Sequence, residues 1–176
     1  MIRLRGRKKE KRGKGFLIRV VNLQNEVKID KKYAQRVAEE AIRLGTRNKR
    51  KPGERKSEVG IIFVNNNCIK RLNRRYRRVN QITDVIAFPM RQRREFILPR
   101  HLSFSILGDV FISADRAKVQ AREFGHSIKK EIAILTVHGI LHLLSYDHAK
   151  KKEALTMRSK ENEILSALGI GENEIG

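Results

Sequence analysis

The stretch SIKKEIAILTVHGILHLLS, residues 127–145, is the most apolar segment of this 176-residue chain. Its apolar run from Ile132 to Leu144 is shorter than the roughly 18 to 20 residues needed to cross a bilayer. A helix that is apolar on most sides must be covered by other elements, so we expect it to lie at the centre of a folded domain.

The flanking sequence alternates between strand patterns and helix patterns. This alternation predicts an α+β (mixed α/β) fold, a single domain in which a small mixed sheet of about four strands packs with about five helices. The expected strands are 16–22, 58–65, 83–89 and 104–113, and the expected helices are 30–45, 66–78, 114–125, 127–145 and 149–168. The domain should span 16–170, between a flexible basic arm at 1–15 and a tail at 171–176.

Narrower predictions come from single residues within these elements. Asp30 and Ser113 each precede a helical pattern and are candidate N-caps. Gly108 lies inside a strand pattern, which indicates a bulge or a close approach of another backbone segment. In the helix expected at 66–78, the apolar spacing turns Tyr76 inward, so we expect a core residue there rather than a stacking platform for a base.

Charge narrows the choice of partner. Lys and Arg number 40 and Asp and Glu number 19, for a formal net charge of +21 at pH 7. A field of this size attracts polyanions, with nucleic acid first and an anionic membrane surface second. The alternative is a highly charged surface that has no dedicated partner.

Cysteine content and the start of the chain bear on the compartment. The single cysteine, Cys68, excludes a disulfide framework within the chain and a four-cysteine zinc module. The opening MIRLRGRKKEKRGKG has no apolar stretch behind its charges, unlike a secretory signal. We therefore expect a cytoplasmic protein.

Three histidines follow one another at the end of the apolar helix. His138 and His142 are four residues apart, so they share one helix face and can bind one ion at about 2.0–2.1 Å. The helix should end near Ser145, which lets the chain turn and bring in His148 as a third ligand. Three neutral imidazoles suit Zn²⁺ and leave one coordination position open, although other divalent transition metals are compatible. The alternative is two hydrogen-bonded core histidines and one exposed turn residue.

The same histidine offsets occur in metzincin peptidases, H-E-x-x-H-x-x-G-x-x-H. Here Gly139 stands where those enzymes carry the glutamate that acts as general base. The spacing therefore predicts the metal ligands without ordinary peptidase chemistry.

The block HGILHLLSYDH closely resembles the signature H-G-x-L-H-L-x-G-Y-D-H of the YbeY family of bacterial endoribonucleases, also called rRNA maturation factors. Three further blocks agree with the family in the same order: LNRRYR (72–77), TDVIAFP (83–89) and GDVFIS (108–113). The likeness covers roughly residues 58–168.

The chain departs from the family pattern at a few positions. Ser145 stands where the family has glycine, so a positive φ angle there would strain the turn. Asn80 and Ile82 replace an Asp and a Pro, and Ala87 replaces a serine. None of these changes removes a predicted ligand.

The resemblance implies a zinc-dependent, single-strand-specific endoribonuclease in rRNA processing, maturation and ribosome quality control. Its partners would be RNA, namely rRNA precursors and the ribosome, with no membrane and no nucleotide cofactor. The resemblance also places Arg77 in the active cleft, where its guanidinium would steady the scissile phosphate. We take Arg77 and the ligand His138 as the catalytic residues. From composition alone, Arg77 is one solvated cation among many.

Two further sets of residues complete the predicted site. The segment RLNRRYRR predicts a phosphate-facing surface made of Arg71, Arg74, Arg75, Arg77 and Arg78. Asp147 either orients a ligand histidine from behind or caps the following helix.

Several alternatives stay open. The protein could be a non-catalytic RNA-binding or ribosome-binding factor with a structural metal, or a metallohydrolase of another substrate. The general acid and base, the nucleophile (water or the 2′-hydroxyl), the cleavage site and the oligomeric state are not readable from the residues.

Overall fold

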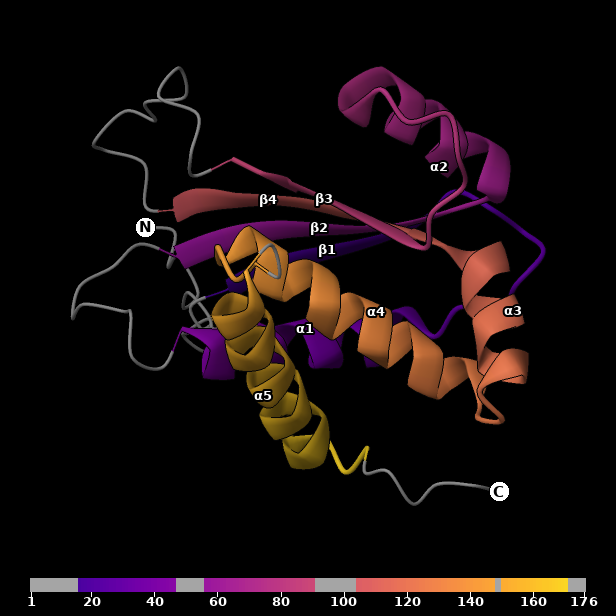
Figure 1. Ribbon diagram of the computed structural model, residues 1–176. Helices are drawn as coiled ribbons and strands as arrows, with labels where there is room; N and C mark the ends of the chain where they lie inside the picture. The colour runs from indigo at the N-terminus through magenta and orange to yellow at the C-terminus, as the bar shows by residue number, and fades with distance from the viewer. Residues whose placement is uncertain (1–15, 47–55, 91–103, 148–149, 171–176) are drawn as a thin grey trace, which may run out of the picture.

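The computed structural model describes residues 16–46, 56–90, 104–147 and 150–170. Within these ranges, one mixed sheet of four strands packs with five α-helices (Figure 1). The α+β fold expected from the sequence is therefore confirmed. The predicted basic arm at 1–15 and the tail at 171–176 lie outside the described residues.

The strands are β1 (Phe16–Asn22), β2 (Lys56–Val64), β3 (Val85–Pro89) and β4 (Phe104–Ser113). Their order across the sheet is β1-β2-β4-β3. β2 runs parallel to both β1 and β4, whereas β3 runs antiparallel to β4. β3 is therefore an edge strand of the sheet.

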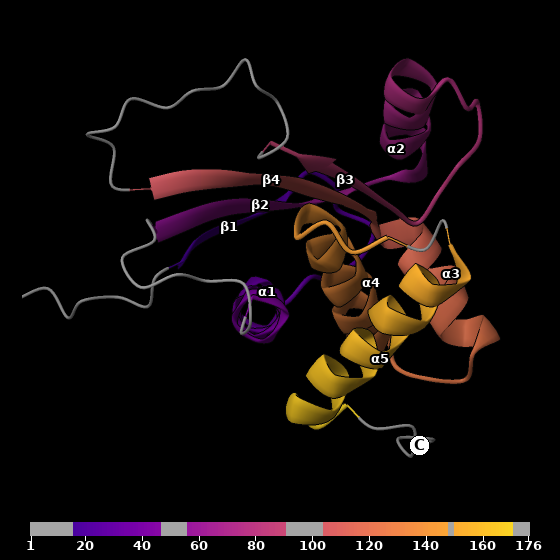
Figure 2. The ribbon, with the colours of Figure 1, turned by 60° about the vertical axis from the view of Figure 1, so that its left-hand side comes forward.

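The helices are α1 (Lys31–Gly45), α2 (Asn66–Leu72), α3 (Ala114–Glu123), α4 (Ile128–Leu143) and α5 (Lys151–Ala167). Figures 1 and 2 show α1, α4 and α5 on one face of the sheet and α2 on the other. In the part of the chain that the structure describes, no helix is long and apolar enough to span a bilayer.

Helix α4 is central, as its apolar sequence predicts. It contacts α1, α3 and α5 as well as the sheet, and residues such as Ile140 and Leu141 are completely buried. Gly139 brings α4 against β4, because a Cβ atom there would lie 2.3 Å from Cγ1 of Val110. The position that holds glutamate in metzincins thus has no room for a side chain in this fold.

The local predictions for caps and for the strand glycine are confirmed. The Asp30 side chain accepts a hydrogen bond from N–H of Tyr33, and Ser113 accepts one from N–H of Arg116. Gly108 has φ +136°, and the ladder between β2 and β4 shifts register beside it. A Cβ atom there would lie 2.1 Å from the carbonyl oxygen of Phe88, so another backbone does approach closely.

The helix predicted at 66–78 differs from the structure in its second half. α2 ends at Leu72 and continues as a π-helical segment, η1 (Asn73–Arg77). The wider π turn rotates later residues off the face that buries Ile69. Tyr76 is consequently 54% exposed, and its assignment to the core was wrong.

Candidate active site

A cavity of about 600 Å³ lies between η1, the start of β3 and the carboxyl end of α4. The residues that line it include Arg77, Asp84, His138, His142, Tyr146 and Asp147. Four of these six were predicted as site residues from the sequence. The fold therefore brings residues from separate segments of the chain to one place.

His138 and His142 face each other across one turn of α4. Their Nε2 atoms are 3.0 Å apart, and their rings are inclined at 75° with centroids 4.6 Å apart. Two nitrogen ligands on a tetrahedral ion with bonds of 2.0–2.1 Å would be separated by about 3.3 Å. The pair can therefore supply two donors to one ion with little rearrangement.

Glu161 holds His138 from behind. Its Oε1 lies 2.6 Å from Nδ1 of His138, so Nδ1–H donates to the carboxylate and the Nε2 lone pair faces His142. A carboxylate behind an imidazole in this way is the usual support of a metal-ligating histidine. The donor set thus fits a divalent transition metal.

Glu161 was not predicted, although the sequence carries a signal for it. On α5 it lies four residues after Met157 and three before Ile164, both of which are buried. A carboxylate on the inward face of a helix needs a partner, because an unpaired buried charge is costly. Asp147, for which the sequence left open this role or a helix cap, lines the cavity, and its role stays a prediction.

The chain turns sharply after α4. N–H of Ser145 donates to the carbonyl of His142, N–H of Tyr146 donates to that of Leu141, and Ser145 has φ +66°. This is a Schellman motif, in which glycine is the usual left-handed residue. The Tyr146 hydroxyl then donates to the carbonyl of Gly45 at 3.2 Å, which ties the turn to the end of α1.

The third predicted ligand, His148, lies outside the described residues. Among the residues that are described, no three His, Cys, Asp or Glu side chains are grouped to hold a metal ion. The structure therefore describes only the His138–His142 pair and its Glu161 support, and zinc binding and the complete ligand set stay predictions.

Arg77 lines the same cavity from η1, a segment far from the histidines in the sequence. The other four predicted RNA-binding arginines are also exposed: Arg71 on α2, Arg74 and Arg75 on η1, and Arg78 directly after it. Of these five arginines, all within the described residues, Arg77 alone lines the cavity. The others can contact phosphates only outside it.

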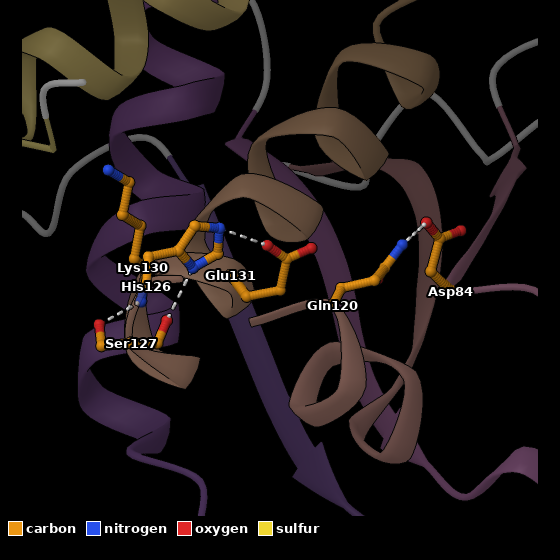
Figure 3. Close-up of polar contacts among 6 residues, drawn as sticks. All are labelled: Asp84, Gln120, His126, Ser127, Lys130 and Glu131. Atoms are coloured by element: carbon orange, nitrogen blue, oxygen red, sulfur yellow. Dashed lines mark hydrogen bonds and ion pairs between the residues drawn. The ribbon is translucent and has the colours of Figure 1, made fainter. Parts of the chain in front are cut away.

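Asp84 brings a negative charge to the same cavity. Its Oδ1 accepts hydrogen bonds from N–H of Val85 at 2.8 Å and from the Thr83 hydroxyl at 3.2 Å. Its Oδ2 accepts one from Nε2 of Gln120 on α3 at 3.0 Å (Figure 3). Burial acts to raise the pKa of Asp84, but these hydrogen bonds outweigh burial and hold the pKa below its usual value. The carboxylate is therefore ionised at neutral pH.

A second buried carboxyl lies beyond Gln120. Glu131 is almost fully buried, and its Oε2 lies 3.2 Å from Nε2 of His126 (Figure 3). Burial, and then the charge of Asp84, raise the pKa of Glu131 to about 7. Nδ1 of His126 lies 3.3 Å from the carbonyl oxygen of Ser127, so Nδ1–H donates there and Nε2 accepts a hydrogen bond from the Glu131 carboxyl in its protonated form.

A histidine pair that is supported by a carboxylate and shares a cavity with an arginine is typical of metal-dependent enzymes that act on anionic substrates. Comparison with known proteins identifies the family. The family model described as Endoribonuclease YbeY matches residues 19–169, so the chain belongs to the YbeY family.

Curated relatives agree along most of the chain. A protein of Carboxydothermus hydrogenoformans named Endoribonuclease YbeY is 40% identical over 151 residues, covering 86% of this chain and 96% of the relative. One of Caldicellulosiruptor bescii, with the same name, is 39% identical over 155 residues, with the same coverage of both chains. These matches confirm the resemblance read from the four sequence blocks.

The fold has a counterpart among solved structures. The solution structure of a Thermotoga maritima protein matches with a TM-score of 0.52 and 22% identity, covering 87% of this chain and 92% of that one. At this identity the likeness supports the fold alone.

Proposed function

We propose that this chain is a zinc-dependent endoribonuclease that cleaves single-stranded RNA during rRNA processing and ribosome quality control. Family membership supports the reaction class. The observation that carries the proposal is the convergence of His138, His142 and Arg77 on one cavity. We further propose that the protein acts in the cytoplasm, where ribosomal RNA is matured.

The positive surface around the cavity suits a polyanion. Arg77 lines the cavity, and four exposed arginines lie beside it on α2 and η1. Contacts from guanidinium groups to phosphates supply affinity without sequence preference. The arrangement therefore favours a nucleic acid strand over a small uncharged substrate.

Each side chain of the proposed site has a distinct task. His138 and His142 would hold the metal ion, with His148 as the third predicted ligand, and Glu161 fixes the orientation of the His138 ring. When bound, the ion supplies a Lewis acid and lowers the pKa of water. Arg77 binds the scissile phosphate and stabilises charge that develops in the transition state.

Asp84 adds a negative charge to the cavity, opposite in sign to that of Arg77. Because its carboxylate is ionised, it repels phosphate and favours hydroxyl groups on its side of the cavity. We infer that the phosphate lies toward Arg77 and the ribose toward Asp84. The nucleophile is either water or the 2′-hydroxyl of the substrate.

Cleavage of a labelled single-stranded RNA by the purified protein tests this function. The wild type with zinc should cut the strand, and His138→Ala and a chelator should each abolish cutting. His126→Ala, which removes an imidazole outside the cavity, is the matched control and should still cut.

Binding without cutting, unaffected by the chelator, would overturn the proposed enzyme and favour a non-catalytic RNA-binding factor. A folded His138→Ala variant that cuts as fast as the wild type would exclude this metal site as the catalytic one. Circular dichroism of each variant establishes that it is folded.

A further inference from the structure

A second, smaller hollow of about 280 Å³ lies beside the candidate active site. Three aromatic side chains line it, Tyr76 from η1, Phe88 from β3 and Phe111 from β4. Aromatic residues are only 6% of the chain, so three at one hollow are a concentrated apolar surface. Pro89 lines both this hollow and the larger cavity, which makes the two neighbours across β3.

The three rings form a connected cluster. The centroids of Tyr76 and Phe88 lie 5.0 Å apart at 71°, and those of Phe88 and Phe111 lie 5.7 Å apart at 85°. Such edge-to-face packing holds each ring in place. Tyr76 nevertheless leaves 54% of its surface to solvent, so much of the cluster's outermost ring is uncovered.

Positive charge surrounds the exposed ring. The guanidinium carbon of Arg75 lies 5.7 Å from the centroid of Tyr76, within the range of a cation–π contact. The next residue after Tyr76 is Arg77, which lines the larger cavity. Consecutive side chains of η1 therefore line two adjacent cavities, Tyr76 the aromatic hollow and Arg77 the cavity that contains the histidine pair.

We propose that the aromatic hollow binds an unpaired nucleobase of the substrate, next to the phosphate that Arg77 holds. This inference rests on the proposed function, because it takes single-stranded RNA as the ligand. A base has flat apolar faces that stack on a tyrosine ring regardless of sequence. Asp109, on the wall of the hollow, offers an acceptor to the amino groups of bases.

The occupant follows from what lies beside the hollow. A nucleotide joins a flat base to a phosphate. The aromatic hollow matches the base, and the guanidinium of Arg77 in the neighbouring cavity matches the phosphate. The exposed arginines on η1 would repel a basic protein segment and attract the strand. Bases in a duplex are stacked on one another and cannot enter, so the hollow would also select single strands.

A base analogue whose fluorescence falls on stacking tests this inference. The probe is a single-stranded RNA with one 2-aminopurine, mixed with the full chain in a stopped-flow instrument and read before cleavage. The chain contains no tryptophan, so the signal comes from the RNA. The wild type should quench the probe most strongly when 2-aminopurine flanks the cleavage site.

The variants separate stacking from other effects. Tyr76→Phe should quench like the wild type, whereas Tyr76→Ala should lose the quenching and bind roughly tenfold more weakly. Phe124→Ala is the matched control, because Phe124 is an exposed aromatic residue (68%) at the end of α3. This control should behave as the wild type.

Wild-type quenching by Tyr76→Ala, or quenching that does not depend on the position of 2-aminopurine, would overturn the inference. Failure of the proposed function has a different outcome. In that case neither the wild type nor any variant cuts RNA, while a loss of quenching in Tyr76→Ala still supports the base-binding hollow. Cutting by Tyr76→Ala with unchanged affinity and quenching rejects the hollow alone.

Discussion

The Oε1 atom of Glu161 lies 2.6 Å from Nδ1 of His138 and ties helix α5 to the candidate metal site. This contact joins residues 23 positions apart in the chain. It fixes both the tautomer and the orientation of the imidazole that faces the cavity.

Glu161→Gln should therefore weaken metal binding by about 10- to 100-fold, the usual effect of losing a carboxylate behind a ligand histidine. Competition with a chromogenic chelator measures the affinity. Glu163→Gln, an exposed position on the same helix that pairs with Lys160, is the matched control and should bind as the wild type. Equal affinities of both variants and the wild type would show that the contact does not support a metal ligand.

The turn after α4 makes a prediction on stability. Ser145 adopts φ +66°, which glycine tolerates better than serine. Ser145→Gly should stabilise the protein by about 0.5–1 kcal/mol, measured by urea unfolding. A loss of stability would mean that the serine side chain makes a contact that outweighs the backbone strain.

Glu131 predicts how stability depends on pH. Its pKa in the folded protein is raised from 4.5 to about 7, so the folded state binds this proton more tightly than the unfolded state. The stabilisation is fully present below pH 4.5 and is lost as the pH rises through about 7, by at most about 3 kcal/mol. Glu131→Gln should flatten this fall between pH 5 and about 8. An unchanged pH profile in the variant would show that Glu131 does not titrate there.

The arginines of α2 and η1 predict a steep dependence of RNA binding on salt. With several phosphates contacted, the logarithm of affinity should fall with the logarithm of salt concentration by a slope of several units. Arg74→Gln should reduce the slope by about one unit. A flat dependence in the wild type would contradict the phosphate-facing surface.

The parts of the site that the sequence predicts are those set by local spacing. His138 and His142 share a face because they are four residues apart on a helix, and the helix ends where the polar residues after Leu144 begin. The turn at Ser145 follows in the same way. Arg77 came instead from the family resemblance, since its approach to the histidines depends on how η1 packs.

The parts that the sequence does not predict depend on contacts between distant segments. Glu161 and Asp84 reach the site from α5 and from the start of β3, and nothing in their own neighbourhoods names their partners. Tyr76 was assigned to the core because apolar spacing assumes an α-helix, and the π turn of η1 breaks that period.

Metal analysis of the purified protein tests the central claim most directly. The account predicts about one zinc ion per chain in the wild type and its loss in a folded His142→Ala variant. Full zinc occupancy in His142→Ala, or no divalent metal bound by the wild type when zinc is supplied, would contradict it.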